Sequence, residues 1–163
     1  MDDLETWAKR QNAHVLVSLH NKYRAQQTEP RQGEHLSFLR ESDIYPLFPL
    51  VDVLVTDYSS SFADLLLLDR PLVFYPYDLE RYQANEGLAA EYDAITPGPK
   101  ARTFPELLAC LEETLRTQGA AWAEERRRVR DLYHAFQDGK SSQRIWDILK
   151  NAFPTLDGGE TGR

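Results

Sequence analysis

The residues best suited to chemistry in this sequence follow three short apolar runs that have the composition of β-strands. The first run ends at His20, and Lys22 and Arg24 come directly after it. The second runs into Thr-Asp-Tyr-Ser-Ser-Ser at 56–61, and the third is followed by Asp78. Ligands of an open parallel sheet bind beyond the carboxyl ends of its strands. We therefore expect these polar side chains to gather at one edge of a sheet.

The segment 56–61 is the most informative of the three. A strand that leads directly into serines and then into a helix leaves several backbone N–H groups unpaired. These groups and the positive end of the helix dipole attract anions, and the hydroxyls of Ser59 and Ser60 add donors for phosphate oxygens. The alternative is that Asp57 or Ser59 only caps the helix. The glycines of a P-loop or of a dinucleotide fingerprint do not occur here, so neither motif applies.

His20 is the candidate catalytic residue, although a lone histidine after a strand is more often structural. Its neighbours Lys22 and Arg24 favour an anionic ligand, because they stand beside a candidate phosphate site in an acidic chain. The alternative is a solvated loop with ordinary charges. Asp78 and Tyr82 are candidate sugar contacts or simply loop residues.

The composition restricts the classes of protein. With 163 residues, 42% hydrophobic and 28% charged, the chain has the makeup of one soluble globular domain. Its 19 basic and 26 acidic residues give a net charge of −7, which argues against sequence-independent binding of nucleic acid. The single cysteine, Cys110, excludes an internal disulfide framework and is interpreted as a small buried hydrophobe. Neither a signal peptide nor a membrane-spanning segment is recognisable, so we expect a cytoplasmic protein.

The order of elements is typical of an α/β protein. Apolar runs alternate with helical patterns, and each run is apolar throughout, as in parallel strands covered on both faces. We predict a Rossmann-like parallel sheet with helices on both faces, in one domain over 1–153, and a disordered tail over 154–163. The expected strands are 14–20, 35–39, 51–56 and 72–75, and the expected helices are 3–11, 42–50, 62–68, 103–116, 120–136 and 142–153.

Three further features bear on the site or on partners. The segment 79–90 is predicted to be irregular with one helical turn, and 96–99, Thr-Pro-Gly-Pro, to be a rigid connector. The basic run 126–130 either contacts anionic lipid headgroups at the inner face of the cell membrane or, as we favour, is a solvated helix face paired with Glu124 and Glu125. Cysteine, histidine and carboxylate spacing suggests no metal site, and we expect no cofactor.

Several motifs follow one another along the chain. Asp-Val-Leu-Val-Thr-Asp-Tyr-Ser-Ser at 52–60 is followed by Arg-Pro at 70–71 and by Phe-Tyr-Pro-Tyr-Asp-Leu-Glu-Arg-Tyr at 74–82. Pro-Gly-Pro at 97–99 and the sequence from Tyr133-His134 to Asp138-Gly139-Lys140 come later. Over residues 14–150 this sequence resembles the CDP-glycerol glycerophosphotransferase family, which contains teichoic acid primases and polymerases and related capsule polymerases.

The resemblance implies one half of a GT-B fold, namely the C-terminal, nucleotide-binding domain. In that role His20 contacts the donor pyrophosphate and assists its cleavage, and the polar residues of 56–60 hold the pyrophosphate and its glycerol end. The loop around Gly98 would lie near the nucleotide. The residues expected to bind the substrate are Thr56, Asp57, Ser59, Ser60, Lys22, Arg24, Asp78 and Gly98.

The reaction implied is transfer of a polyol phosphate from a CDP-activated donor to a cell-wall or capsule polymer, with CMP as leaving group. Negative charge grows on the leaving phosphate, where a helix N-terminus and a protonated His20 stabilise it. Two departures matter: Glu86-Gly87 stands where the family often has Arg-Gly, and the family's N-terminal domain, with its second essential histidine, has no counterpart here. We expect a chain that binds the donor and transfers little without that domain as a partner.

Two other functions remain open. The chain could be half of a UDP-sugar-dependent GT-B glycosyltransferase or epimerase, which would prefer UDP to cytidine nucleotides. It could also be a non-catalytic interaction domain, in which the serine turn at 59–61 is no more than a helix cap.

Overall fold

The computed structural model describes residues 2–19, 33–39, 43–87 and 90–154. Four short strands pair in parallel, two by two. β1 (Val15–Val17) pairs with β2 (Leu36–Phe38), and β3 (Leu54–Thr56) pairs with β4 (Leu72–Phe74). The predicted parallel pairing is confirmed, and each strand is shorter than its apolar run.

β4 has backbone partners on both sides. Tyr75 N–H donates to Thr56 O on the β3 side at 2.8 Å, while Phe74 N–H donates to Pro99 O on the other side at 2.9 Å. Lys100 thus forms an isolated parallel bridge with Phe74. The connector that was predicted to be rigid and non-helical therefore ends by extending the sheet beside β4.

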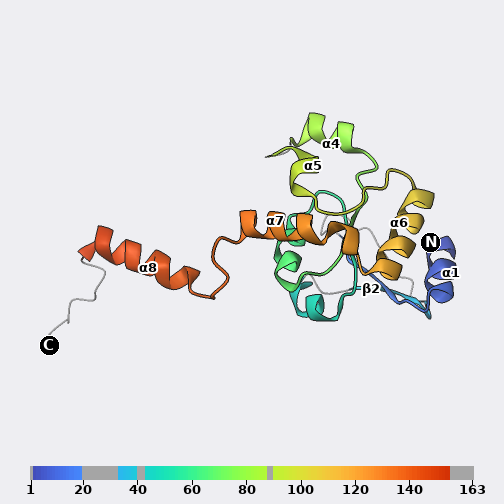
Figure 1. Cartoon of the computed structure of the whole chain (residues 1–163), viewed down its shortest axis with the longest axis horizontal. Coiled ribbons are helices and arrows are strands. Elements are labelled where there is room, and N and C mark those ends of the chain that lie inside the picture. Colours follow the sequence, from blue (N-terminus) through green and yellow to red (C-terminus); the bar gives the residue numbers. More distant parts are fainter. Residues whose placement is uncertain (1, 20–32, 40–42, 88–89, 155–163) are drawn as a thin grey trace.

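Helices and 3₁₀ turns make up much of the rest of the described chain, and all of them except α8 surround these strands (Figure 1). They are α1 (Asp2–Arg10), η1 (Tyr45–Leu50), α3 (Ser61–Leu65), η2 (Leu66–Leu68), α4 (Leu79–Asn85), α5 (Tyr92–Ile95), α6 (Phe104–Thr117), η3 (Ala120–Trp122), α7 (Ala123–Tyr133) and α8 (Ser141–Ala152). At the start of α6 the Thr103 hydroxyl accepts the Glu106 N–H at 3.4 Å, and the Glu106 carboxylate accepts the Arg102 N–H at 2.8 Å. The capping signal read from the sequence is confirmed, with the second bond displaced by one residue.

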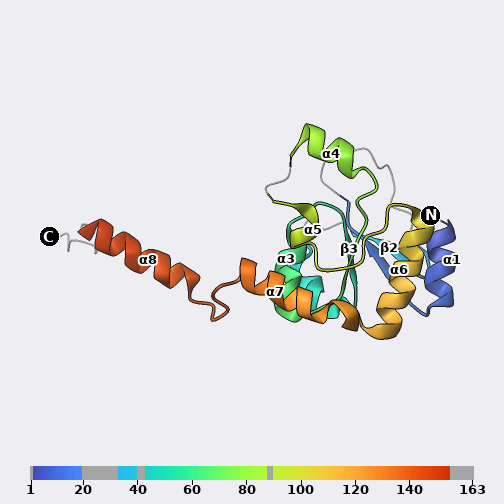
Figure 2. The same ribbon diagram turned by 45° about the horizontal axis from the view of Figure 1, so that its top comes forward.

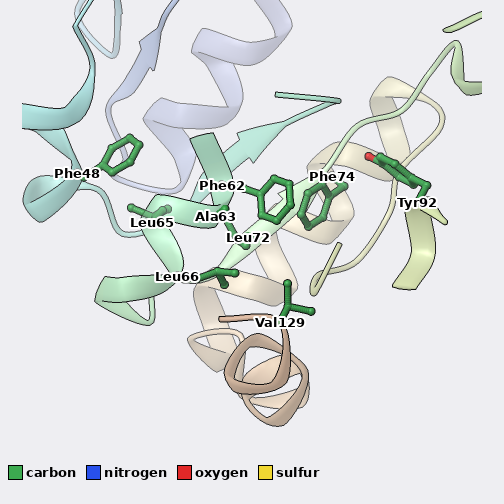
Figure 3. Close-up of a cluster of buried hydrophobic side chains, with 9 residues drawn as sticks. All are labelled: Phe48, Phe62, Ala63, Leu65, Leu66, Leu72, Phe74, Tyr92 and Val129. Atoms are coloured by element: carbon green, nitrogen blue, oxygen red, sulfur yellow. The ribbon is translucent and has the colours of Figure 1, made fainter. Parts of the chain in front are cut away.

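Alternate residues of β4 face two different hydrophobic clusters. Leu72 and Phe74 lie in the first, which joins β4 to α3, η2 and α7 and is drawn in Figure 3. Val73 lies in the second, which joins β4 to α1 and α6. Successive strand side chains point to opposite faces of a sheet, so helices cover β4 on both sides, as predicted.

β1 and β3 are less buried than their apolar sequences suggest. Leu16 in β1 is 42% exposed and Val55 in β3 is 39% exposed, whereas every residue of β4 is buried. An apolar run predicts a strand, but burial on a given face depends on whether a helix covers that face. Only β4, which has neighbours on both edges and both faces, meets the expectation in full.

Two segments differ from the sequence prediction. Residues 79–85, expected to be irregular with one turn, form the helix α4, which is held by the bond from Tyr58 to Asp78 at its start and by stacking of Tyr82 on Tyr58. Arg126, expected on a solvated helix face, is 4% exposed and donates to Asp69 at 3.0 Å and to Gly119 O at 2.7 Å. The prediction was wrong for Arg126. It expected partners within the same helix, Glu124 and Glu125, whereas the actual partner, Asp69, is 57 residues away in the sequence.

Figures 1 and 2 show α8 standing away from the helices that surround the strands. No helix in the described residues is long and apolar enough to cross a membrane.

Cys110 is partly buried and packs against the cluster around Val73, in agreement with its interpretation as a small hydrophobic residue. The tail from residue 155 onward lies outside the described residues.

Candidate functional site at the end of strand β3

Four predicted binding residues lie together where β3 ends. Thr56 is half-buried and its carbonyl is bonded to Tyr75, so the end of β3 is fixed to the end of β4. Asp57, Ser59 and Ser60 follow and are exposed. Because both strands run in the same direction, these side chains stand at the carboxyl edge, where ligands of parallel sheets bind.

The serine turn, residues 57–61, is organised by its own short bonds. Asp57 Oδ1 accepts the Tyr58 N–H at 2.6 Å, and the Ser59 and Ser61 hydroxyls are 3.0 Å apart. Within the described chain, no side-chain hydrogen bond caps α3 at Ser60. The capping alternative concerned Asp57 or Ser59, and Ser59 Oγ does accept the Ser61 N–H at 3.4 Å, so this alternative stays open beside anion binding. Since α3 has only 5 residues before it tightens into η2, an anion here would depend on hydroxyl and N–H donors more than on a helix dipole.

Asp78 is connected to the serine turn by a hydrogen bond from Tyr58. The Tyr58 hydroxyl donates to Asp78 Oδ1 at 2.9 Å, and Arg81 Nη2 donates to Asp78 Oδ2 at 2.6 Å. The bond from Tyr58, aided by Arg81, holds the pKa of Asp78 below its ordinary value, so the carboxylate is ionised at neutral pH. Burial and the same bond raise the pKa of Tyr58, which therefore remains a donor.

Aromatic rings hold the turn from two directions. The Tyr58 ring stacks on Tyr82 of α4 with centroids 3.9 Å apart and planes at 15°. From the α5 side, the buried Tyr92 donates its hydroxyl to Asp57 O at 2.7 Å. Sequence analysis named Tyr82 without deciding its role and missed Tyr58 and Tyr92 as organising residues. Tyr58 was detectable from its place in the motif, whereas Tyr92 was not, because the short helix that carries it leaves no periodic signal.

Two open depressions lie on the described surface. One of about 370 Å³ borders α4, α5 and the aromatic residues that hold the turn, and its lining residues are Gln83, Ala90, Glu91 and Tyr92. The other, of about 470 Å³, is on α8 and is lined by Asp147, Lys150, Asn151 and Pro154. We associate the first with the candidate site, because Tyr92 is also bonded to the serine turn.

Gly98 stands apart from the other candidates. A Cβ atom on Gly98 would lie 2.3 Å from Leu72 O and 3.2 Å from the Phe74 ring, so close packing on β4 already requires glycine here. Leu72 begins β4, and Gly98 therefore lies toward the amino end of the strand, away from the serine turn. Lys100 Nζ holds the connector through Thr96 O at 2.8 Å and Gly98 O at 3.3 Å. A contact of Gly98 with a nucleotide stays a prediction.

The remaining candidates, His20, Lys22 and Arg24, fall outside the described residues. Their predicted roles in catalysis and binding therefore stay predictions. Across the residues that are described, no group of three or more histidine, cysteine, aspartate or glutamate side chains is placed to hold a metal ion.

Comparison with known protein families shows which family the chain belongs to. The model of the family CDP-Glycerol:Poly(glycerophosphate) glycerophosphotransferase matches residues 2–151. The chain belongs to this family. The match includes all four strands, the serine turn and α4, which confirms the resemblance read from the motifs at 52–60 and 74–82.

Relatives of this glycerophosphotransferase family member are longer proteins. Teichoic acid ribitol-phosphate primase of Bacillus spizizenii is 29% identical over 143 residues, which cover 84% of this chain and 34% of that protein. Teichoic acid glycerol-phosphate transferase of Staphylococcus aureus is 34% identical over 124 residues, which cover 73% of this chain and 32% of that protein. The chain thus spans about a third of the length of these curated relatives.

Solved structures share the fold. The wall teichoic acid polymerase TagF matches with a TM-score of 0.76 at 24% identity, over 97% of this chain and 38% of the TagF chain. A TagF variant soaked with CDPG matches with a TM-score of 0.73 at 26% identity, over 97% of this chain and 40% of that chain. The α/β fold with parallel strands is confirmed, and it corresponds to one part of a GT-B-like enzyme.

Proposed function

We propose that this chain is the donor-nucleotide-binding domain of an enzyme that transfers a polyol phosphate from a CDP-activated donor to a cell-wall or capsule polymer. The observation that carries the proposal is the serine turn. In a chain of this family, Asp57, Ser59 and Ser60 stand exposed at the carboxyl edge of β3, where a diphosphate can be met by hydroxyl and backbone N–H donors.

The proposed reaction is a substitution at phosphorus. An acceptor hydroxyl attacks the phosphorus nearest the polyol, its proton goes to a base, and the bond from that phosphorus to the bridging oxygen breaks, so that CMP leaves with the electron pair. Negative charge grows on the CMP phosphate. Donors of the serine turn and a protonated His20 would stabilise this charge more in the transition state than in the bound donor. The role of His20 rests on the family motif alone.

We also propose that transfer requires a further domain. The chain spans about a third of its curated relatives, and a substitution at phosphorus needs a base for the acceptor hydroxyl that the serine turn does not supply. This partner domain would belong to the same protein or to another chain. The acceptor polymer and a cytoplasmic location, with peripheral contact at the inner face of the membrane, stay predictions.

Nucleotide binding tests the proposal directly. In isothermal titration of the chain with CDP-glycerol, CDP-ribitol, CMP and UDP, we expect the CDP-activated polyols to bind and UDP to bind at least about tenfold more weakly, a difference of about 1.4 kcal/mol. Preference for UDP would favour the UDP-sugar alternative. Absence of binding to every cytidine compound would refute the proposed function.

A pair of double variants separates donor binding from a structural role. Replacing Ser59 and Ser60 with alanine should weaken CDP-glycerol binding at least about tenfold, because hydrogen bonds to charged groups contribute about 1.5–3 kcal/mol each. Ser141 and Ser142, two exposed serines that begin α8, provide the matched control, and their alanine double variant should bind normally. If the turn were only a cap, the first variant would lose about 1 kcal/mol of stability and no affinity.

A further inference from the structure

We propose that Tyr58 and Asp78 act as one positioning unit that fixes α4 beside the serine turn, and that Asp78 does not itself contact the donor. This inference rests on the proposed function and revises one part of it, since Asp78 was predicted to be a substrate-binding residue. The juxtaposition that carries it is a phenol from the β3 loop bonded to a carboxylate at the start of α4.

Both oxygens of Asp78 accept a hydrogen bond from a neighbouring side chain, one from Tyr58 of the β3 loop and one from the exposed Arg81 of α4. Oδ1 accepts the Tyr58 hydroxyl and Oδ2 accepts Arg81, and the Asp78 side chain is only 20% exposed. An ionised carboxylate has about four lone-pair sites, so each Asp78 oxygen could accept one further bond. The positioning role rests instead on the low exposure of the side chain and on the Tyr58 bond, which fixes its orientation.

The Tyr58 side chain contacts α4 at two points. Its hydroxyl is bonded to Asp78, its ring stacks on Tyr82 at 3.9 Å, and it packs against the hydrophobic cluster around Phe74. Tyr82 is one turn beyond Asp78 on the same helix, and its N–H donates to Asp78 O at 2.9 Å. One tyrosine thus holds two successive points of α4.

This arrangement places the positioning unit next to the residues that would meet the donor. Ser59 and Ser60 follow Tyr58 directly in the chain, while Tyr92 fixes the carbonyl of the preceding Asp57. Gln83, on α4, lines the neighbouring depression. Loss of the bond between Tyr58 and Asp78 would leave the Tyr58–Tyr82 stacking in place but hold α4 less firmly beside the serine turn, so a ligand that contacts both would bind more weakly.

A second tyrosine–aspartate bond supplies a matched control. Tyr45 in η1 donates to Asp64 Oδ2 at 2.9 Å, the same distance as in the positioning unit. Tyr45 is 55% exposed, and its bond does not involve α4. Tyr45→Phe and Tyr58→Phe each remove one phenol oxygen and nothing else.

Hydrogen exchange tests whether the unit holds α4. In Tyr58→Phe, the amides of Tyr82 and Glu86 should exchange about three- to tenfold faster than in the wild type, because one net hydrogen bond is lost. In Tyr45→Phe they should not change. Unchanged exchange in Tyr58→Phe would overturn the inference, whatever the chain binds.

A double-mutant cycle on CDP-glycerol affinity tests whether the unit serves the donor. Tyr58→Phe and Asp78→Ala should each weaken binding about three- to tenfold, and the double variant should be no weaker than the weaker single variant. Asp78→Asn retains an acceptor for Tyr58 and should recover most of the affinity. Additive losses would overturn the inference and return Asp78 to direct contact with the donor.

The two failures are distinguishable. If the wild-type chain binds no cytidine nucleotide, the proposed function falls and with it the claim that the unit serves a donor, while hydrogen exchange still decides whether the unit orders α4. If the wild type binds and Tyr58→Phe binds equally well, the positioning role alone is refuted.

Discussion

α7 and α8 are amphipathic helices of 11 and 12 residues. They differ in burial: α7 has buried side chains, whereas the apolar residues of α8 are exposed or only partly buried. In α7, Val129 is fully buried and Arg126 is 4% exposed. In α8, within the described chain, no side chain is buried, and Ile145 and Ile148 are 59% and 67% exposed. The same kind of sequence pattern thus forms a helix in both places and packs only one of them.

The contacts at the two helices explain the difference. α7 is held by segments far away in sequence, with Val129 in the cluster of Leu66 and Phe74 and Arg126 bonded to Asp69. The contacts at the start of α8 are local, since Arg144 lies 4.0 Å from the Phe136 ring centroid and bonds to Asp138 at 3.0 Å. α7 is therefore part of the cooperative fold, and α8 is joined to it through a short connection.

The most severe test is removal of an apolar side chain under α7. Leu66 is 1% exposed and lies in the cluster that contains Val129. Leu66→Ala should lower the free energy of unfolding by about 2–5 kcal/mol, through lost transfer energy and a residual cavity. Urea denaturation followed by circular dichroism measures this. A loss below about 1 kcal/mol would mean that α7 is not part of the cooperative core.

The next largest effect should come from the buried ion pair of α7. Arg126→Met removes bonds to Asp69 and Gly119 O, and we expect a loss of about 1.5–3 kcal/mol, because Asp69 is half-exposed and keeps its hydration. The neighbouring Arg127 is exposed and serves as the control, for which Arg127→Met should change stability by less than about 0.5 kcal/mol. Equal losses for both variants would contradict the assignment.

Acid should loosen the connection to α8 before it affects α7. The bond from Arg144 holds the pKa of Asp138 below its ordinary value. Because the folded-state pKa is depressed, this stabilisation is present above the unfolded value of about 4 and is lost as pH falls through the folded value. Hydrogen exchange between about pH 5 and pH 3 should show loosening of residues 138–144 first. Simultaneous loss of protection in α7 would be inconsistent with this.

The smallest effect should come from the apolar face of α8. Ile148→Ala should change the stability of this chain by less than about 0.5 kcal/mol, because a side chain that is 67% exposed loses little burial. Thermal unfolding gives the measurement, and a large destabilisation would show that α8 packs on the domain in solution.

Much of the fold was predictable because it depends on local patterns. Apolar runs located the four strands, and the spacing of Thr103 and Glu106 located the start of α6. α4 was not predictable in the same way, because it is held by a distant tyrosine, Tyr58, which bonds to Asp78 and stacks on Tyr82. Burial of Arg126 was also missed, because its partner Asp69 is 57 residues away.

In the candidate site, too, the residues that depend on local sequence were predicted and those that depend on distant contacts were not. Asp57, Ser59 and Ser60 were found from sequence because they are consecutive after a strand, and parallel strands deliver such residues to one edge. The involvement of Tyr58 and Tyr92, and the bond that Asp78 Oδ1 accepts from Tyr58, were not found. Each depends on an approach between segments 20 or 35 residues apart.

The sequence by itself determined the strand and helix pattern, the α/β class and the family to which the motifs at 52–60 and 74–82 belong, since these follow from local periodicity and contiguous residue types. Only the tertiary structure decided that α7 is packed while α8 is not, that Gly98 serves close packing on β4, and that Asp78 is bonded to Tyr58. The physical reason is that burial and hydrogen bonding each depend on two segments. The local sequence of one segment does not show which distant segment will pack against it.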